Sequence, residues 1–386
     1  MRRSDQRARR DWIQPGDRGV GEAASGDAVV KPLERLQAKL AEDGLEALLV
    51  TDIANVRWLT GFTGSAGTVV AAPDRACFFT DGRYTIQAGE QVGPLMEVRT
   101  TTTEAPLAAQ VAELAGQWGL SSIAFDGDAV TVNTYRQWTE KIPGVELKPV
   151  QDPCAVLRMV KTPEEVAKIR DACRLTDAAF QHVLRLIQPG VAEYDIHLEI
   201  EFFLKRQGAE LAFDPIVVSG ARSALPHGKA SEKKLEIGDF VTMDFGAKLD
   251  GWCADLTRTV AVGRADDRMR EVYGQVLEAQ RAAIDALRDG ANGKDVDTLA
   301  REVLARKDLA RYFTHGLGHG LGTVVHDHGR LSQTADMRIE CGQVWTVEPG
   351  VYIEGFGGVR IEDDVWVTED RPVILNEAPK ELLILP

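Results

Sequence analysis

The apolar positions change their pattern about halfway along the chain. Up to residue 150, short apolar runs typical of strands alternate with segments whose apolar residues recur every three or four positions, as on one helix face. Strands are predicted at 45–50, 68–71, 76–80, 96–100, 122–125 and 145–150, and helices at 33–40, 85–92, 104–118 and 132–141. Strands alternating with helices predict an α/β layer whose sheet is largely covered.

The second half follows another order, in which two helices precede a group of strands and the arrangement then repeats. A helix is predicted to begin at Thr162, because a threonine cap, Pro163 in the first turn and Glu165 as capping-box partner agree. It should end at Pro189-Gly190. Further helices are predicted at 195–207, 267–288 and 294–306, and β-rich segments at 215–219, 240–248, 252–262, 344–353 and 358–367. This half therefore reads as a duplicated α+β pattern.

Asp152-Pro153 marks the boundary between the two patterns. We expect a weakly ordered arm at 1–28, an α/β domain at 29–152 and an α+β domain at 158–386. The first ten residues carry five arginines, but no apolar stretch follows them before Val29, as a secretory signal would require. The expected location is the cytoplasm.

Charge and cysteine content exclude several classes of function. The chain has 59 acidic and 45 basic residues, a net charge of −14, which disfavours general nucleic-acid binding. No apolar run approaches the roughly 18 residues that cross a bilayer, so no membrane partner is expected. The five cysteines form no C-x-x-C pair, which argues against a disulfide framework or a thiolate zinc site and favours free thiols.

Two acids in the second half could share a site. Asp244 ends a predicted strand, and Asp255 follows eleven residues later, beyond a glycine-containing turn. Two antiparallel strands joined in this way can place both carboxylates side by side. Taken alone, such a pair is more often a solvated rim, since aspartate usually lies outside.

Histidines gather further along the chain. Of seven, four fall between residues 315 and 328, namely His315, His319, His326 and His328. Glycines flank His319 on both sides, and we expect the missing side chains to let an ion or substrate approach the backbone. A histidine-rich surface loop is the alternative.

Two glutamates complete a candidate metal site. Glu348 ends an apolar strand before Pro-Gly, and Glu362 follows Arg360 by two residues; either could simply form a salt bridge. With Asp244, Asp255 and His319 they supply four carboxylates and one imidazole. Two divalent cations would balance the charge of the carboxylates, and the donors suit Mn²⁺ or Co²⁺, with Fe²⁺ or Zn²⁺ as alternatives. Such a pair could hold a bridging hydroxide and polarise a carbonyl.

From about residue 32 onward, the sequence closely resembles the pita-bread metallopeptidases (peptidase family M24), the superfamily of methionine aminopeptidase, aminopeptidase P and prolidase. The resemblance implies a pita-bread domain with a pseudo-twofold α+β repeat, preceded by a smaller α/β domain of the creatinase/prolidase type. The family's metal-binding motifs, including H-G-x-G-H, E-P-G and R-x-E-D, place its ligands on Asp244, Asp255, His319, Glu348 and Glu362.

The N-terminal segments 45–52, 55–64 and 79–84 also look like those of the creatinase/prolidase domain. Methionine aminopeptidases lack this domain and creatinase lacks the ligand set, which leaves the Xaa-Pro peptidases. The resemblance thus implies hydrolysis of Xaa-Pro bonds by a metal-bridging hydroxide, small peptides with proline in second position as substrates, and a homodimer.

The resemblance also assigns catalytic or substrate-binding roles within the pocket. His227 and His326 would contact the scissile carbonyl or the proline side, and His315 would shape the pocket. Glu348 would relay a proton to the departing nitrogen, and Arg360 would support Glu362 or the substrate.

Substrate length depends on Arg330, four residues after His326. Its guanidinium could bind the free carboxylate of a dipeptide, as microbial prolidases do at a similar place, which favours an Xaa-Pro dipeptidase over an aminopeptidase P that acts on longer peptides. Arg330 could instead be a surface charge, and the region of Trp58 and Phe62 could cap the site. A non-catalytic peptide-binding module and an aminopeptidase without proline preference are further alternatives.

Overall fold

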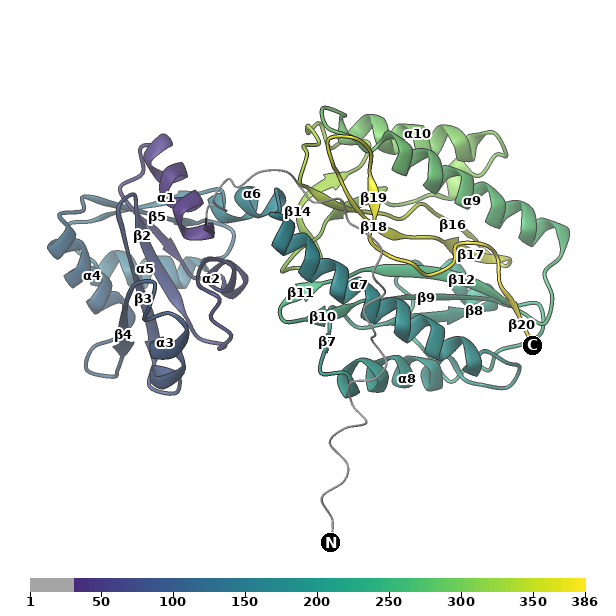
Figure 1. The fold of residues 1–386 in the computed structure, drawn as a ribbon, viewed down its shortest axis with the longest axis horizontal. Helices are drawn as coiled ribbons and strands as arrows, with labels where there is room; N and C mark the ends of the chain where they lie inside the picture. Colours follow the sequence, from purple (N-terminus) through teal and green to yellow (C-terminus); the bar gives the residue numbers. More distant parts are fainter. Residues whose placement is uncertain (1–30) are drawn as a thin grey trace, which may run out of the picture. The chain divides into compact units, whose positions relative to one another are not determined.

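The computed structural model describes residues 31–386 (Figure 1), so the predicted arm at 1–28 lies outside the described residues. Within this range no helix combines the length and the apolar character that crossing a membrane would need. All five cysteines are free thiols, as expected, and four of them are buried.

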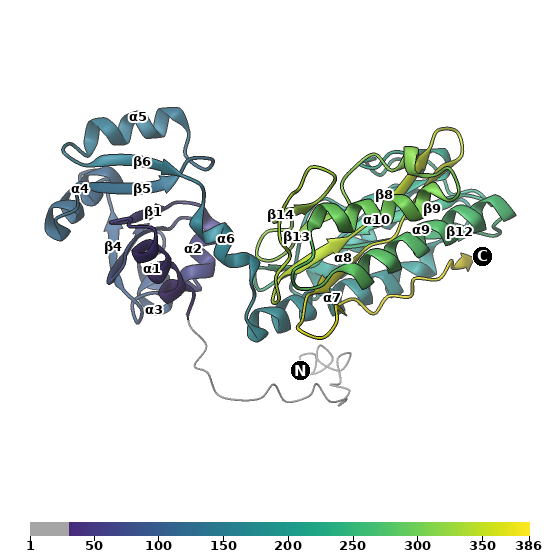
Figure 2. The same ribbon diagram turned by 90° about the horizontal axis from the view of Figure 1, so that it is seen from above.

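The first part of the chain forms one six-stranded sheet with the strand order β4-β3-β2-β1-β5-β6, of which Figure 2 shows β1, β5 and β6 side by side. Its strands are β1 (Leu48–Val50), β2 (Thr68–Ala72), β3 (Arg75–Asp81), β4 (Glu97–Thr101), β5 (Ser122–Asp126) and β6 (Glu146–Val150). Its helices are α1 (Pro32–Glu42), α2 (Ile53–Thr60), α3 (Thr85–Gln91), α4 (Leu107–Trp118) and α5 (Val132–Lys141). All six predicted strands and four predicted helices are present, whereas α2 was not predicted.

Both faces of this sheet are covered. Along β1, Leu48 and Val50 belong to a core with α1, α2 and α3, while Leu49 faces a second core with α4 and α5. Successive side chains of a strand point to opposite faces, so a wholly apolar strand needs cover on both sides. The continuous apolar runs are explained in this way, and the expected covered sheet is confirmed.

Helix α6 (Pro153–Met159), which was not predicted, leads to α7 (Pro163–Val183). The predicted capping box is present: the Thr162 hydroxyl accepts from the Glu165 amide at 3.3 Å, and Glu165 Oε2 accepts from the Thr162 amide at 2.8 Å. A short 3-10 turn, Leu184–Leu186, continues α7 before the predicted stop at Gly190.

The remaining helices come in the predicted pairs, α7 with α8 (Glu193–Arg206) and α9 (Asp267–Ala286) with α10 (Gly293–Ala305). Figure 1 shows the two pairs flanking the strands. The strands after the first pair are β7 (Glu210–Leu211), β8 (Ile216–Ser219), β9 (Phe240–Phe245), β10 (Ala247–Leu249), β11 (Trp252–Cys253) and β12 (Leu256–Val262). The second pair is followed by β13 (Gly318–Gly320), β14 (Asp327–Leu331), β15 (Val344–Val347), β16 (Gly350–Ile353), β17 (Gly357–Arg360), β18 (Asp363–Trp366), β19 (Val373–Ile374) and β20 (Ile384–Leu385). The duplicated α+β order is confirmed.

Four of the predicted β-rich segments are interrupted. The chain leaves one sheet and enters another between β9 and β10, between β11 and β12, between β15 and β16, and between β17 and β18. Asp255, Glu348 and Glu362 lie at the last three of these interruptions. A residue at such a junction belongs to neither strand, so its side chain can point into the space between the two sheets.

Candidate metal centre

One cavity of about 460 Å³ brings together every site residue predicted from the sequence. Its lining includes Asp244, Asp255, His319, Glu348, Glu362, His227, His315, His326, Arg330 and Arg360. These side chains come from stretches up to 135 positions apart and meet only in the folded chain.

Asp244 reaches the cavity because β9 and β12 have one polar face. Asp244 lies opposite Thr257 in the antiparallel register, and Thr242 lies opposite Thr259. The alternate residues of β9, such as Met243, are buried in the apolar core beneath. The period of two along each strand therefore separates the polar cavity wall from the core that supports it.

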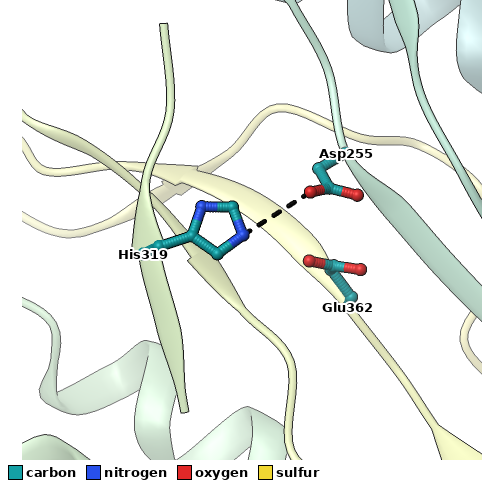
Figure 3. A group of neighbouring side chains, drawn as sticks. All are labelled: Asp255, His319 and Glu362. Atoms are coloured by element: carbon teal, nitrogen blue, oxygen red, sulfur yellow. Dashed lines mark ion pairs between the residues drawn. The ribbon is translucent and has the colours of Figure 1, made fainter. Parts of the chain in front are cut away.

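Donor atoms of Asp255, His319 and Glu362 all lie within 4.8 Å of one another. His319 Nε2 is 3.6 Å from Asp255 Oδ2 and 3.5 Å from Glu348 Oε1. Figure 3 shows the imidazole directed at Asp255, with the Glu362 carboxylate beside it. This spacing leaves the donors close enough for one ion to touch all three.

The hydrogen bond of the other ring nitrogen sets the tautomer of His319. Its Nδ1 lies 3.0 Å from the Gly320 carbonyl oxygen, which can only accept, so Nδ1 carries the proton. Burial lowers the pKa of His319 to about 4, so the ring is neutral at pH 7. The Nε2 lone pair consequently faces the carboxylates, as a metal ligand requires.

The glycines on either side of His319 have a packing role that was not predicted. A Cβ at Gly318 would lie 2.0 Å from the Thr346 carbonyl oxygen, and one at Gly320 would lie 2.1 Å from that of His328. The missing side chains therefore allow the neighbouring strands β15 and β14 to pack closely. Gly318 also lines the cavity, and the expectation that the missing side chains let an ion or substrate approach the backbone stays a prediction.

The buried carboxylates carry charge that the protein alone does not balance. Burial, followed by repulsion from neighbouring carboxylates, raises the pKa of Asp255 and of Glu362 well above the ordinary range. Burial likewise raises the pKa of Glu348 to about 8. Asp244 Oδ1 and Asp255 Oδ1 are buried and receive no hydrogen bond from the part of the chain that the structure describes. Buried anionic oxygens without partners are costly, and divalent cations among these oxygen and nitrogen donors would offset that cost.

Arg360 joins the carboxylates into one network. Its Nη2 donates to Asp244 Oδ2 at 2.6 Å, and its Nε donates to the Thr257 hydroxyl at 3.0 Å. Thr257 in turn donates to Glu362 Oε2 at 2.6 Å. Arg360 was expected to support Glu362 or the substrate. The structure shows an indirect connection to Glu362 and a direct one to Asp244.

His315 is held by two hydrogen bonds at the edge of the same network. Its Nδ1 donates to the Gly316 carbonyl at 2.8 Å, so Nε2 accepts from the Tyr352 hydroxyl at 2.8 Å. Tyr352 accepts from Arg360 Nη1 at 2.7 Å. Burial lowers the pKa of His315 to about 4, which keeps the ring neutral. Tyr352 and Arg360 thus connect His315 to the carboxylate network.

The more exposed lining residues are His227, His326 and Arg330. The His326 ring lies edge-on to the His319 ring, with 4.5 Å between centroids. Arg330 Nη1 donates to the backbone carbonyls of Asp327 and Gly329, at 2.8 and 2.7 Å. These three residues present donors to whatever occupies the cavity.

Some participants were not predicted. Thr257 and Tyr352 connect the network, and Phe213 and Ile216 form an apolar part of the cavity wall. Thr257 could have been found, because it follows Asp255 by two residues in the predicted β-rich segment 252–262, where alternate residues share a face. Trp58, considered as a cap, is instead buried in the core and donates to Glu165 at 2.8 Å.

Phe62 is also buried, against Phe78 and Tyr84, and does not line the cavity. His182 and His197 lie outside the cavity lining; their rings hydrogen-bond to Glu199 and to the Pro215 carbonyl, respectively.

Two family profiles match the chain. The creatinase/prolidase N-terminal domain matches residues 32–160, and metallopeptidase family M24 matches residues 167–369. The second match alone spans more than half of the chain, and together they confirm the predicted combination of an α/β domain with an α+β domain.

Full-length relatives agree. The chain is 42% identical to an uncharacterized peptidase, YqhT, of Bacillus subtilis, over 92% of this chain and 99% of the relative. It is 33% identical to an Xaa-Pro dipeptidase of Pyrococcus furiosus, over 91% and 99%. A Bacillus anthracis structure described as an Xaa-Pro dipeptidase superposes with a TM-score of 0.88 at 41% identity, over 92% and 99% of the two chains. On this evidence the chain is a metallopeptidase that belongs to family M24.

Proposed function

We propose that the protein hydrolyses Xaa-Pro peptide bonds with two divalent metal ions, most readily in dipeptides. The observation that carries the proposal is the single cavity in which five oxygen and nitrogen donors meet three histidines and two arginines. The identity of 33% to a full-length Xaa-Pro dipeptidase supports the substrate class.

The metal ions would be held by Asp244, Asp255, His319, Glu348 and Glu362, with Mn²⁺ expected and Co²⁺, Zn²⁺ or Fe²⁺ as alternatives. When bound, such ions supply a nucleophilic water at neutral pH and polarise the scissile carbonyl. The four carboxylates offset the charge of two divalent cations, whereas one cation would leave a net negative charge buried.

The protein residues would orient the substrate and move a proton. An Xaa-Pro bond is a tertiary amide without an N–H, so a peptidase cannot use that group to position it. His227 and His326, which reach into the cavity, can bind the carbonyl or the proline side instead. Glu348 would carry a proton to the departing ring nitrogen, since its carboxylate lies in the cavity and accepts from the Thr346 hydroxyl at 3.3 Å.

The preference for dipeptides rests on Arg330. Its side chain lines the cavity, and its Nη1 bonds to two backbone carbonyls hold the guanidinium in place. A fixed guanidinium can bind the carboxylate that a dipeptide presents next to proline. An Xaa-Pro aminopeptidase is the second candidate, favoured by a Thermotoga maritima X-Pro aminopeptidase structure with a TM-score of 0.84 and 35% identity, over 92% and 99% of the two chains.

A side-by-side assay in Mn²⁺ tests the proposal. The substrates are Ala-Pro, Ala-Pro-Ala and Ala-Ala at equal concentration. Faster turnover of Ala-Pro than of both others is expected. Faster turnover of Ala-Pro-Ala would indicate an aminopeptidase P, comparable turnover of Ala-Ala would remove the proline preference, and binding without turnover would indicate a peptide-binding module. A cytoplasmic location, a homodimer, and the domain boundaries at 29–152 and 158–386 stay predictions.

A further inference from the structure

Glu193, the first residue of α8, is fully buried at 0% exposure, yet it lies outside the cavity lining. Its Oε1 accepts from the Ser219 amide at 2.7 Å and from the Ser219 hydroxyl at 2.9 Å. Its Oε2 accepts from the Ser231 amide at 3.1 Å and from the Ser231 hydroxyl at 2.7 Å. One carboxylate therefore joins two points of the chain twelve positions apart.

The segment closed by these bonds is the loop that carries His227. It leaves β8 at Ser219 and returns at Ser231, and both Pro226 and His227 at its tip line the cavity. The tip is also held from the metal side, because Arg360 Nη1 donates to the Pro226 carbonyl at 3.3 Å. Among residues 31–386, none forms a hydrogen bond with the His227 side chain, so its position follows from the loop backbone.

Hydrogen-bond donors surround the Glu193 carboxylate at both ends of the loop. Each oxygen faces a backbone N–H, which can only donate, together with a hydroxyl. Arg222, within the loop, donates from Nε to both oxygens at 3.3 and 3.1 Å and supplies the compensating charge. Burying a carboxylate costs free energy unless its partners are well placed, and here every partner belongs to this one loop.

We propose that Glu193 is a positioning residue that fixes His227 in the cavity by closing the ends of loop 219–231. The inference rests on the proposed role of His227 in binding an Xaa-Pro substrate. It adds a residue on a helix outside the cavity to the set that determines substrate placement.

The test is Glu193→Gln in the full-length, Mn²⁺-loaded protein. The glutamine side chain is nearly the same size but has one oxygen and one NH₂ group. Its NH₂ group would face the backbone N–H of either Ser219 or Ser231, and because two donors cannot bond to each other, one end of the loop must be released. Asp177→Asn is the matched control. Asp177 is also buried on a helix and accepts from the amides of Glu377 and Ala378, at 2.6 and 3.2 Å, but none of these residues lines the cavity.

Two readouts separate positioning from general stability. Amide hydrogen exchange over 219–231 should accelerate in Glu193→Gln and stay unchanged in Asp177→Asn. In Leu-Pro hydrolysis, Glu193→Gln should lower kcat/KM by about tenfold or more in the wild-type background, since small misplacements carry large rate costs. In a His227→Ala background the same change should cost less than about twofold, because residues that act through one another are not additive.

An equal loss in both backgrounds, or unchanged exchange in the loop, would overturn the proposal. Ser231→Ala provides a second variant if Glu193→Gln does not fold: it removes one donor and should reproduce a smaller, equally non-additive loss. Absence of Leu-Pro hydrolysis by the wild-type protein would instead refute the proposed function, while the exchange readout would still report on the loop.

Discussion

Arg360 and Asp244 share a hydrogen bond of 2.6 Å between Nη2 and Oδ2, at the wall of the cavity where the candidate metal ligands meet. Asp244 lies in β9 and Arg360 ends β17, so the bond connects two different sheets. Through Thr257 the same guanidinium also reaches Glu362. One buried arginine at 3% exposure thus orients two of the five donors.

Arg360→Lys keeps the charge but loses the planar fork that serves Asp244, Thr257 and Tyr352 together. Residues that orient metal ligands typically contribute about 10–100-fold to metal affinity or activity. We expect a loss of that size in Mn²⁺ affinity, measured by titration calorimetry, and in kcat/KM. Mn²⁺ affinity equal to the wild type would show that Arg360 does not orient the donors.

Mn²⁺ affinity should rise with pH. Burial raises the pKa of Glu348 to about 8, so near neutrality the metal-free site holds a proton that an incoming cation must displace. Calorimetry in buffers of different ionisation enthalpy should detect proton release between pH 6.5 and 8. Glu348→Gln, which has no proton to lose, should release fewer protons. Affinity independent of pH in the wild type would contradict the raised pKa.

The stability of the metal-free protein should change with pH in the opposite direction. An acid whose folded pKa is about 8, above its ordinary 4.5, binds more protons in the folded state, so stability falls as pH rises between those values. His319, with a folded pKa of about 4, lowers stability only as pH falls below about 6.5. The Tm of the metal-free protein, measured by thermal unfolding, should therefore decrease from pH 6.5 to pH 8. The increase in Tm on adding Mn²⁺ should be larger at pH 8 than at pH 6.5.

Arg330→Ala should affect dipeptides selectively. Losing a hydrogen-bonded charge pair costs about 1.5–3 kcal/mol, which corresponds to roughly 10–100-fold in KM for Leu-Pro. For Leu-Pro-Ala, whose carboxylate lies one residue further on, KM should change by less than about threefold on the same reasoning. Equal increases for both peptides would remove the argument for a dipeptidase.

Arg158 and Asp327 form a buried ion pair of 2.8 Å directly beside His326, at 7% and 2% exposure. Arg158→Ala removes a positive charge that balances the buried Asp327 carboxylate. Breaking such a pair typically costs about 3–5 kcal/mol of unfolding free energy. Arg174→Ala is the control, because its 3.2 Å pair with Asp171 is more than half exposed and should contribute less than about 1 kcal/mol. Denaturant unfolding measures both, and similar small losses would show that the buried pair is dispensable.

The periodic patterns predicted most elements because burial imposes them. The capping box at Thr162 and the apolar strand at β1 are local signals, and both are present where expected. Helix α2 was not predicted, although Asp52 accepts from the Asn55 amide and Gly61 adopts a positive φ at its end. Its eight residues are too short to show a clear period.

The sequence predicted which residues form the site but not how the fold arranges them. Sequence motifs indicated Asp255, Glu348 and Glu362, yet an apolar run gave no sign that the chain changes sheet at each of them. That change depends on which strands pair, a long-range property that local patterns do not contain. The close packing at Gly318 could not be anticipated for the same reason, since the atom that excludes a side chain belongs to Thr346 in another strand.

The most direct measurement is Leu-Pro hydrolysis by the metal-stripped protein during a Mn²⁺ titration, with bound metal determined at each step. Turnover should be absent at the start and reach its plateau when two ions are bound per chain. Full hydrolysis by the stripped protein, or two bound ions without any hydrolysis of Leu-Pro, would show that these five donors do not form a dinuclear Xaa-Pro peptidase centre.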